Sequence, residues 1–264
     1  MTREQDGEVV LRGGFTNDGL VTRVGATVRR PVRATGSATR ALLEHLERVG
    51  FEGSPRHLGW DDQGREVLSF VDGDAPIEPF PDWALTDEAL VSVGELLRRY
   101  HDAVATFDPT GHRWPRPVPA AFGGDLLCHN DPNLDNVVFS GGRAVGLIDF
   151  DLAAPGSAAW DVACAVRFWA PLRDDRDVPE RLRGRSLARL RIFADAYGLS
   201  AEQRARLPDA VRAAHTWAYA VVRDAVAEDH EAFGRFWRDG GRERAERTAA
   251  WLAAHTRDLA AALV

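Results

Sequence analysis

Short alternating runs of apolar and polar residues dominate the first seventy positions, and this period of two is typical of β-strands. Strands are expected over residues 8–12, 20–24, 27–32, 56–60 and 66–71. One helix interrupts them, with Ser37 as its expected N-cap and Gly50 at its end. Its apolar positions recur at helical spacing and are Ala41, Leu42, Leu46 and Val49. The pattern predicts a small, mostly antiparallel sheet with one helix packed on a face.

Long helical patterns replace the short runs from Thr86 onward. The helix expected to begin there has its apolar positions at Leu90, Val93, Leu96, Leu97 and Tyr100. A proline-rich linker follows over residues 114–119, then two short apolar strands, and beyond Trp160 the chain is almost wholly helical. We therefore expect an α+β fold of two lobes, with a small lobe of strands and one helix over residues 1–72 and a larger helical lobe over residues 73–264.

Composition and charge narrow the classes of function. Of the 264 residues, 45% are hydrophobic and 28% charged, as in ordinary globular proteins, and the net charge of -7 argues against nucleic-acid binding. The sequence contains no lysine, so all 33 basic residues are arginines. Cys128 and Cys164 lack metal-ligand spacing, and no apolar run is long enough to cross a membrane. These features predict a cytoplasmic protein without a membrane partner and leave the oligomeric state open.

The segment from Leu126 to Asp161 carries the candidate chemistry. A hairpin about Gly141 and Gly142 is expected to bring Asn136 back beside Asp149, because opposing residues of a two-stranded ladder lie only about 5 Å apart. An amide oxygen and a carboxylate are ligands that suit Mg²⁺, which leaves its other positions to water and phosphate. Asp131 would lie at the mouth of the same cleft, where it could accept the proton of a substrate hydroxyl.

The arrangement His129-x-Asp131-x-x-x-x-Asn136, followed by Ile148-Asp149-Phe150, resembles the catalytic loop and metal-binding Asp of the aminoglycoside phosphotransferase and choline kinase families. The resemblance implies a protein-kinase-like fold and a phosphotransferase that uses ATP, or alternatively GTP, with Mg²⁺. It assigns Asp131 as the catalytic base and Asn136 and Asp149 as metal ligands. His129 takes a supporting catalytic role, orienting the loop or touching substrate, and Asp161 is expected to accept N–H groups of the catalytic loop.

The resemblance also implies nucleotide contacts, although the pattern departs from the family there. Residues 13–19 occupy the place of a phosphate-covering loop, with Gly13, Gly14 and Asn17 as candidates, but a plain hairpin turn explains them equally well. The family's phosphate-anchoring lysine is missing. Arg29 is the first choice to replace it, with Arg30 expected on the other face of the strand. The backbone of Ser69, Phe70 and Val71 is expected to lie against the adenine.

The ion pair that orders the phosphate anchor in kinases is also in doubt, because Glu44 and Glu47 fall a turn or two late in the helix. Asp151, where protein kinases have glycine, is either a spare acidic group or solvated. A non-catalytic binding or immunity protein that keeps the fold and sequesters a ligand is therefore the rival hypothesis.

Only eleven residues separate Asp149 from Asp161, too few for the segment that presents a peptide to a protein kinase. A small hydroxyl-bearing acceptor is therefore favoured, with an aminoglycoside or another antibiotic ahead of a choline-like or homoserine-like metabolite. The C-terminal helices carry aromatic and acidic side chains that could hold a polycation, although most of the aromatics are expected in the core. They are Trp169, Trp217, Tyr219, Asp224, Glu228, Asp229, Glu231 and Trp237.

Overall fold

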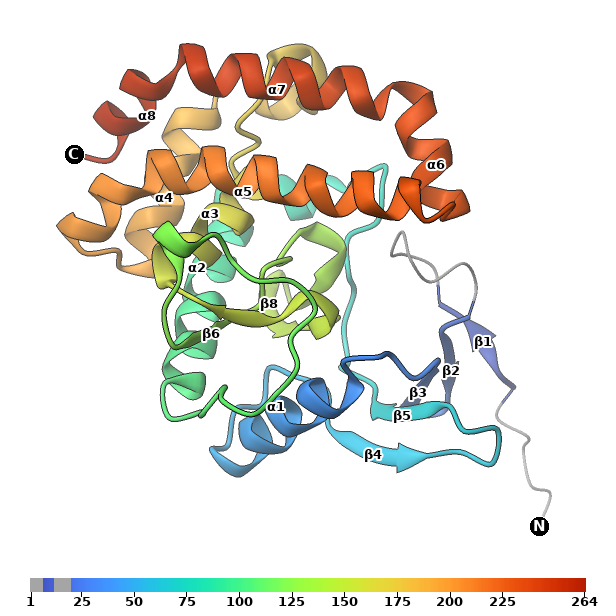
Figure 1. Cartoon of the computed structure of the whole chain (residues 1–264). Helices are drawn as coiled ribbons and strands as arrows, with labels where there is room; N and C mark the ends of the chain where they lie inside the picture. The colour runs from blue at the N-terminus through green and yellow to red at the C-terminus, as the bar shows by residue number, and fades with distance from the viewer. Residues whose placement is uncertain (1–6, 12–19) are drawn as a thin grey trace.

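A five-stranded antiparallel sheet forms the N-terminal part of the chain in a computed structural model that describes residues 7–11 and 20–264 (Figure 1). The strand order is β1-β2-β3-β5-β4. The strands are β1 (Val9–Val10), β2 (Thr22–Val24), β3 (Thr27–Arg30), β4 (His57–Trp60) and β5 (Glu66–Ser69). Each is shorter than the sequence pattern predicted. Proline at position 31 cannot donate to the ladder, which accounts for the end of β3 at Arg30.

Helix α1 (Gly36–Arg48) packs beside this sheet, as expected, but two details differ from the prediction. Thr35, not Ser37, is the N-cap residue, and it makes no side-chain capping hydrogen bond. Val49 is 45% exposed, so it is not part of the buried face. That face instead includes Leu43 and the buried His45, whose ring bonds the carbonyl of Ala103.

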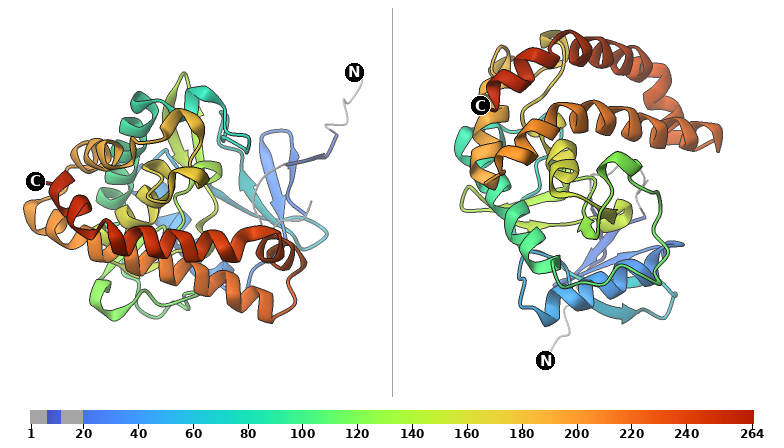
Figure 2. Two further views of the ribbon diagram at one scale, coloured as in Figure 1. Left: turned by 90° about the horizontal axis from the view of Figure 1, so that it is seen from above. Right: turned by 60° about the vertical axis from the view of Figure 1, so that its left-hand side comes forward.

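The remaining helices form the larger part of the molecule (Figure 2). Helix α2 begins directly after Thr86, close to the predicted start, and the Thr86 side chain caps it by accepting a hydrogen bond from Ala89 N. All five apolar positions predicted for α2 are fully buried. The helices are α2 (Asp87–Val104), α3 (Ala158–Trp169), α4 (Ser186–Tyr197), α5 (Ala201–Ala227), α6 (Glu231–Phe236), α7 (Arg242–Ala254) and α8 (Thr256–Ala262). Helix α5 runs alongside both α3 and α7. It lies over residues 126–161, the segment that carries the candidate chemistry (Figure 1 and Figure 2).

Two small antiparallel ladders lie between α2 and α3. Strands β6 (Leu126–Cys128) and β9 (Ala154–Gly156) form one, and β7 (Val137–Ser140) and β8 (Arg143–Leu147) form the predicted hairpin. Gly141 and Gly142 both have positive φ, 58° and 78°, the conformation that a tight hairpin turn demands. The turn brings the two ends of the hairpin together, and a one-residue register shift between Val138 and Phe139 sets their final pairing, Val137 with Leu147.

The chain passes from the sheet to the helical part through Gly73 and Asp74. Asp74 exchanges both backbone hydrogen bonds with Phe139 of β7, at 2.8 and 2.9 Å. Gly73 has φ 140°, and a Cβ at this position would lie 2.3 Å from the Phe139 carbonyl oxygen. Only glycine fits this close crossing. The sheet is thereby tied directly to the catalytic hairpin.

The α+β fold with a small antiparallel sheet and a larger helical part is confirmed. The boundary between residues 72 and 73 stays a prediction. Within the described residues, no helix combines the length and the apolar character needed to cross a membrane.

Candidate active site

The catalytic loop is held from below by one buried carboxylate. Asp161, at the start of α3, is fully buried and accepts hydrogen bonds from the backbone N–H groups of His129 and Asn130, both at 2.8 Å. Its Oδ2 atom also lies 2.9 Å from Nε2 of His101. Burial alone would raise the pKa of Asp161, but the hydrogen bond from His101 and the nearby charges lower it. The structure thus confirms the expected contacts between Asp161 and the loop.

His129 does not reach the space that a substrate could occupy. Its side chain is fully buried, with Nε2 3.0 Å from the carbonyl oxygen of Ile148 and its ring against Phe150. Of the two roles left open by the sequence, the geometry supports orientation of the loop. His129 is therefore a positioning residue, and its assignment among the catalytic residues is corrected.

Asp131, Asn136 and Asp149 meet at the end of the hairpin. Ile148 N donates to the Asn136 carbonyl at 3.0 Å, which places Asp149 one residue beyond the point where the two strands close. Nδ2 of Asn136 donates to the Asp131 carboxylate at 3.1 Å and to the Asp131 carbonyl at 2.9 Å. Asp149 has φ 61°, an uncommon left-handed conformation for a residue other than glycine. The convergence expected from the sequence is thus present in the fold.

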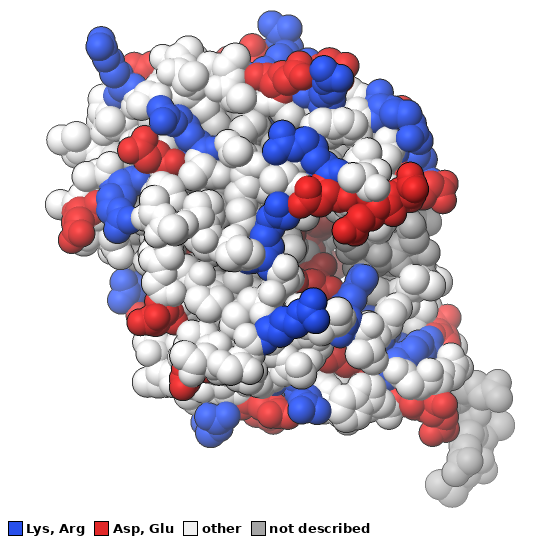
Figure 3. All heavy atoms as spheres, in the orientation of Figure 1, with Lys and Arg blue, Asp and Glu red and all other residues white. Residues whose placement is uncertain are grey.

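Burial and neighbouring charges disfavour the ionised form of both carboxylates of this site. Burial, together with the charges of Asp149 and Asp135, raises the pKa of Asp131 to about 7, against the opposing charge of Arg167. Burial likewise raises the pKa of Asp149 to about 6, together with the charge of Asp151. Both side chains are half-buried, so neither is sealed from the cleft. Acidic side chains are visible in the depth of a hollow between the end of α5 and the sheet (Figure 3).

Crowded carboxylates of this kind fit a divalent cation, because a bound cation compensates the repulsion that raises their pKa values. The described residues contain no group of three or more His, Cys, Asp or Glu side chains arranged as a metal site. Mg²⁺ needs fewer protein ligands than that. Oδ1 of Asn136 accepts no hydrogen bond from any described residue. Among the described residues, the only ion-pair partner of the Asp149 carboxylate is Arg30, 3.9 Å away. These two oxygen donors fit a magnesium ion.

Arg30, and not Arg29, extends to this site. Nη1 of Arg30 lies 2.8 Å from the Asp151 carboxylate and 3.9 Å from that of Asp149. Arg29 instead contacts Thr27 and lies 3.7 Å from Asp61, a residue of the turn after β4. Side chains alternate between the two faces of a strand, so neighbouring arginines cannot share one face. The expected order of the two arginines is therefore reversed.

The partner of this arginine comes from the sheet. Glu66 of β5 lies opposite Arg30 in the ladder, and its carboxylate is 2.6 Å from Arg30 Nε. Burial lowers the pKa of Arg30, but the charges of Asp151 and Glu66 outweigh it and raise the pKa overall. Glu44 and Glu47 of α1 are exposed, in agreement with the missing helix partner. Asp151 is neither spare nor merely solvated, since it also pairs with Arg33 at 3.1 Å.

The segment expected to face the adenine continues from β5. Phe70 N donates to the Ala26 carbonyl at 2.9 Å, so this N–H group is already used inside the sheet. Ser69 is bonded at both its backbone N–H group and its hydroxyl group by the backbone of Arg56. No hydrogen bond joins the Val71 backbone to another residue in the described parts of the chain. Val71 therefore retains both of its backbone groups for a ligand, and the Phe70 carbonyl also accepts no hydrogen bond from the described residues. Gly13, Gly14 and Asn17 lie outside the described residues.

Sequence reasoning missed two groups of residues near the site. Glu66 carried a signal, because it is the one acid at the start of an otherwise apolar strand and pairs directly across from Arg30. Arg167 on α3 and Arg173 just beyond it carried none, because arginines on a helical pattern are normally solvated. Both are half-buried in the fold.

Comparison with known proteins agrees with this geometry. Residues 113–198, which include the catalytic loop and Asp149, match the model of the phosphotransferase enzyme family. The trifolitoxin immunity protein of Rhizobium leguminosarum bv. trifolii is 35% identical over 97% of this chain and 98% of that protein. A homoserine kinase of Brucella anthropi is 30% identical over 66% of this chain, which spans only 49% of that enzyme.

Solved structures show the same fold at low sequence identity. A choline/ethanolamine kinase family protein from Mesorhizobium loti superposes with a TM-score of 0.65 at 17% identity, covering 97% of this chain and 92% of that one. The GDP complex of aminoglycoside 2'-phosphotransferase-IIIa gives a TM-score of 0.62 at 14% identity, covering 94% of each chain. Taken with the family match and the full-length relative, the converging Asp131, Asn136 and Asp149 identify this chain as a member of the phosphotransferase enzyme family.

Proposed function

We propose that this protein transfers the γ-phosphoryl group of ATP or GTP to a hydroxyl group of a small molecule. The observation that carries the proposal is the meeting of Asp131, Asn136 and Asp149 at the closed end of one hairpin. Three oxygen-bearing side chains in this order supply what phosphoryl transfer requires of a protein, namely a proton acceptor beside two metal ligands. The finding that solved relatives of this fold are nucleotide complexes supports the choice of donor.

Asp131 would orient the acceptor hydroxyl and take its proton. Burial and its acidic neighbours raise its pKa to about 7, so it is a better base near neutral pH than an ordinary carboxylate. Asn136 holds that carboxylate in place through its amide N–H groups. Arg30 would bind a phosphate of the nucleotide, because its guanidinium is fixed at the cleft by Glu66 and Asp151. Mg²⁺ on Asn136 and Asp149 would supply charge neutralisation for the phosphates.

A toxic natural product is the acceptor class that the relatives support best. The full-length relative is named for immunity to trifolitoxin, and several structures of the same fold are aminoglycoside phosphotransferases. The homoserine kinase relatives support a small metabolite as the alternative acceptor. The short segment between Asp149 and Asp161 leaves no platform for a peptide in either case. The expected cytoplasmic location stays a prediction.

The test is an acceptor screen with purified protein and Mg-ATP or Mg-GTP. Release of nucleoside diphosphate is followed across antibiotics and hydroxylated metabolites, and the acceptor of each hit is analysed by mass spectrometry for one added phosphoryl group. We expect Asp131→Asn to abolish turnover while nucleotide binding persists. Asp102→Asn is the matched control, since it removes an exposed carboxylate of α2 outside the cleft. Equal turnover in the Asp131 and Asp102 variants would refute the proposal.

Sequestration without catalysis is the second candidate, and the name of the immunity relative motivates it. On that hypothesis the protein binds the toxic compound, which protects the host cell, and later releases the compound unmodified. Asp131→Asn would then retain full protection in cells that express it. Loss of protection together with loss of turnover would instead assign the immunity to phosphorylation.

A further inference from the structure

Two arginines at the end of α3 have no ionic partner among the residues that the structure describes. Arg167 of α3 and Arg173 both lie near Phe168, with their guanidinium carbons 5.2 and 5.8 Å from its ring centre. Trp169, two residues after Arg167, donates from Nε1 to the Pro132 carbonyl at 2.8 Å, so this end of α3 abuts the loop that carries Asp131. The charge of Arg167 lowers the pKa of the Asp131 carboxyl, against the effect of burial. These two side chains, here called the arginine pair, therefore lie beside the catalytic loop.

The arginine pair differs from the other arginines close to the cleft. Arg30 and Arg247 each make ion pairs of 2.9 Å or shorter with carboxylates. Neither guanidinium of the pair makes a hydrogen bond or an ion pair with any residue that the structure describes, and Nε of Arg173 is buried without a partner. Asp177 influences Arg173 but is already bound to Arg247, at 2.7 Å. Two positive charges are thus left uncompensated at half-buried positions, which is unfavourable unless a ligand compensates them.

The positive charge of the arginine pair affects the pKa of a neighbouring histidine. Burial lowers the pKa values of Arg167 and Arg173. Burial and then the charge of Arg167 lower the pKa of His215, on α5, to about 4, with a further contribution from Arg173. In a chain whose net charge is -7, a cationic region beside the catalytic centre is a local reversal.

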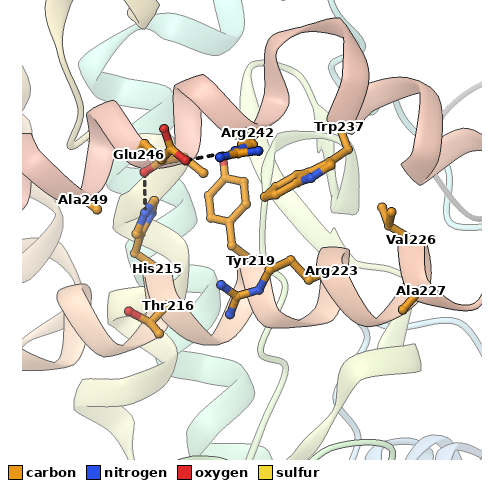
Figure 4. Close-up of a pocket in the computed structure, with 11 residues that line it drawn as sticks. His215, Thr216, Tyr219, Arg223, Val226, Ala227, Trp237, Arg242, Glu246 and Ala249 are labelled. Atoms are coloured by element: carbon orange, nitrogen blue, oxygen red, sulfur yellow. Dashed lines mark hydrogen bonds and ion pairs between the residues drawn. The ribbon is translucent and has the colours of Figure 1, made fainter.

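A cavity lies between α5 and α7, and neither member of the arginine pair lines it. It has a volume of about 550 Å³, within the range of small-molecule sites. Tyr219 and Trp237 stand side by side in it, with ring centres 6.2 Å apart (Figure 4). Its arginines are Arg223, without an ion pair among the described residues, and Arg242, which Glu246 neutralises at 3.0 Å. Arg167 lies on α3, which packs along α5, and the charges of Arg167 and Arg173 lower the pKa of His215 in the cavity lining, so the cavity lies near the pair.

We propose that the acceptor carries an anionic group, a carboxylate or a phosphate, which binds between Arg167 and Arg173 while its hydroxyl lies at Asp131 and its remainder fills the cavity between α5 and α7. This inference rests on the proposed phosphotransferase function and names its substrate class. Guanidinium groups bind both anions through paired hydrogen bonds. A polycationic acceptor, which the acidic side chains of the C-terminal helices suggested, would face like charge at the pair.

Those acidic side chains lie on the outside. Asp224, Glu228, Asp229 and Glu231 are all exposed, and Figure 3 shows acidic side chains along the upper rim of the hollow. Asp224 is paired with Arg116 at 2.6 Å, and Glu231 with Arg235. Exposed, paired carboxylates exert little net attraction on a ligand, whereas half-buried charges without partners exert much more. The arginine pair therefore decides the sign of charge that the site prefers.

Anion binding can be measured without catalysis. The full-length protein is saturated with Mg²⁺ and a non-hydrolysable ATP analogue, and thermal unfolding is followed while inorganic phosphate or glutarate is added, with spermidine as the cationic probe at equal ionic strength. We expect at least one anion to stabilise the wild type and spermidine not to do so. The stronger of the two anions tells whether the acceptor group is a phosphate or a carboxylate.

Substitutions then locate the effect. Arg167→Gln and Arg173→Gln should each weaken anion binding about 10-fold to 100-fold, the usual loss for one charge-assisted contact. Arg167→Lys should retain part of it, and Arg99→Gln, an exposed change on α2, should retain all of it. Without anion, the Gln variants should unfold at the same temperature as the wild type or higher, because they remove an uncompensated charge. A merely structural role predicts the opposite change.

The inference is overturned if no anion stabilises the protein, if spermidine does so more strongly, or if the anion effect survives in the Arg167→Gln, Arg173→Gln double variant. These results do not depend on turnover, so they are separate from failure of the acceptor screen. In that screen, hydroxyl compounds are supplied as pairs of free acid and amide. Preference for the amide would likewise refute the anionic acceptor while leaving the phosphotransferase function intact.

Discussion

Replacement of Asp161 by asparagine should dismantle the catalytic loop while leaving the helices in place. The carboxylate of Asp161 accepts three contacts in a fully buried position, from His129 N, Asn130 N and the ring of His101. An asparagine of the same shape has only one acceptor oxygen. Its amide N–H₂ group must then face at least one backbone N–H group, donor against donor.

The magnitude follows from these contacts. Hydrogen bonds to a charged group contribute roughly 1.5–3 kcal/mol each, and a buried donor left without a partner costs about 1–3 kcal/mol. Loss of the charge and of one backbone acceptor should therefore destabilise the fold by about 3–5 kcal/mol. Displacement of Asp131 by as little as about 1 Å should lower kcat by about 10²-fold.

Urea unfolding and amide hydrogen exchange measure the two parts separately. For Asp161→Asn we expect a lower urea midpoint together with faster exchange of the His129 and Asn130 amides. The control Asp102→Asn should change the unfolding free energy by less than about 0.5 kcal/mol. If Asp161→Asn unfolds within about 1 kcal/mol of wild type and keeps both amides protected, the buried carboxylate contributes no more than a surface one, contrary to this prediction.

Three further outcomes follow from the contacts of other residues. Arg30→Ala should abolish nucleotide binding in calorimetry and, because it leaves Glu66 buried without its partner, cost about 3–5 kcal/mol in urea unfolding; Arg30→Met with Glu66→Leu should recover the stability but not the binding. The pKa of His215 is about 4 in the fold against 6.5 when unfolded, so only the unfolded chain gains this proton as pH falls below 6.5; His215→Gln should therefore remove about 2 kcal/mol of the stability lost between pH 7 and pH 5, measured as the difference from wild type. Gly73→Ala should lower the melting temperature far more than Gly64→Ala, because Gly64 also has positive φ but open space around it.

The catalytic hairpin was predictable because its information is local. Two glycines with the apolar runs on either side of them determine the turn and bring Asn136 to within a residue or two of Asp149, although an irregularity at Val138 and Phe139 shifts the register by one residue. The buried face of α2 was predictable for a similar reason, since its five apolar positions follow the helical period. In both cases a regular repeat converts directly into geometry.

The choice between Arg29 and Arg30 could not be made in this way. The strand period separates the two arginines onto opposite faces but does not say which face turns toward the cleft. That depends on how the sheet packs on the hairpin through Gly73, a contact between distant parts of the chain. The arginine pair could not be predicted for the same reason. Its burial depends on the packing of α3 against α5, which are distant in the sequence and meet only in the fold. Val49 shows the limit even for helices, since its place at the end of α1 leaves it exposed.

The ion-pair partner of Arg30, Glu66, comes from the sheet and not from α1. In kinases the phosphate anchor pairs with a glutamate of the helix, so movement of that helix changes the anchor. Here Glu66 holds Arg30 from the neighbouring strand, across a ladder of backbone hydrogen bonds that keeps the two side chains opposite one another. Among the residues that the structure describes, the exposed carboxylates of α1 make no contact with Arg30, and Glu44 pairs only with Arg40 of its own helix, at 3.6 Å.

We therefore expect nucleotide affinity to be independent of these helix carboxylates. Glu44→Gln with Glu47→Gln should leave the Kd for Mg-ATP within about 2-fold of wild type, because both carboxylates are exposed and solvent and salt screen exposed charges. Glu66→Gln should weaken binding by about 10-fold or more, since one charged contact to the anchor is lost. Calorimetric titration distinguishes the two. Weaker binding in the Glu44, Glu47 double variant would show that α1 does reach the nucleotide site, and the anchor would then respond to movement of the helix as it does in kinases.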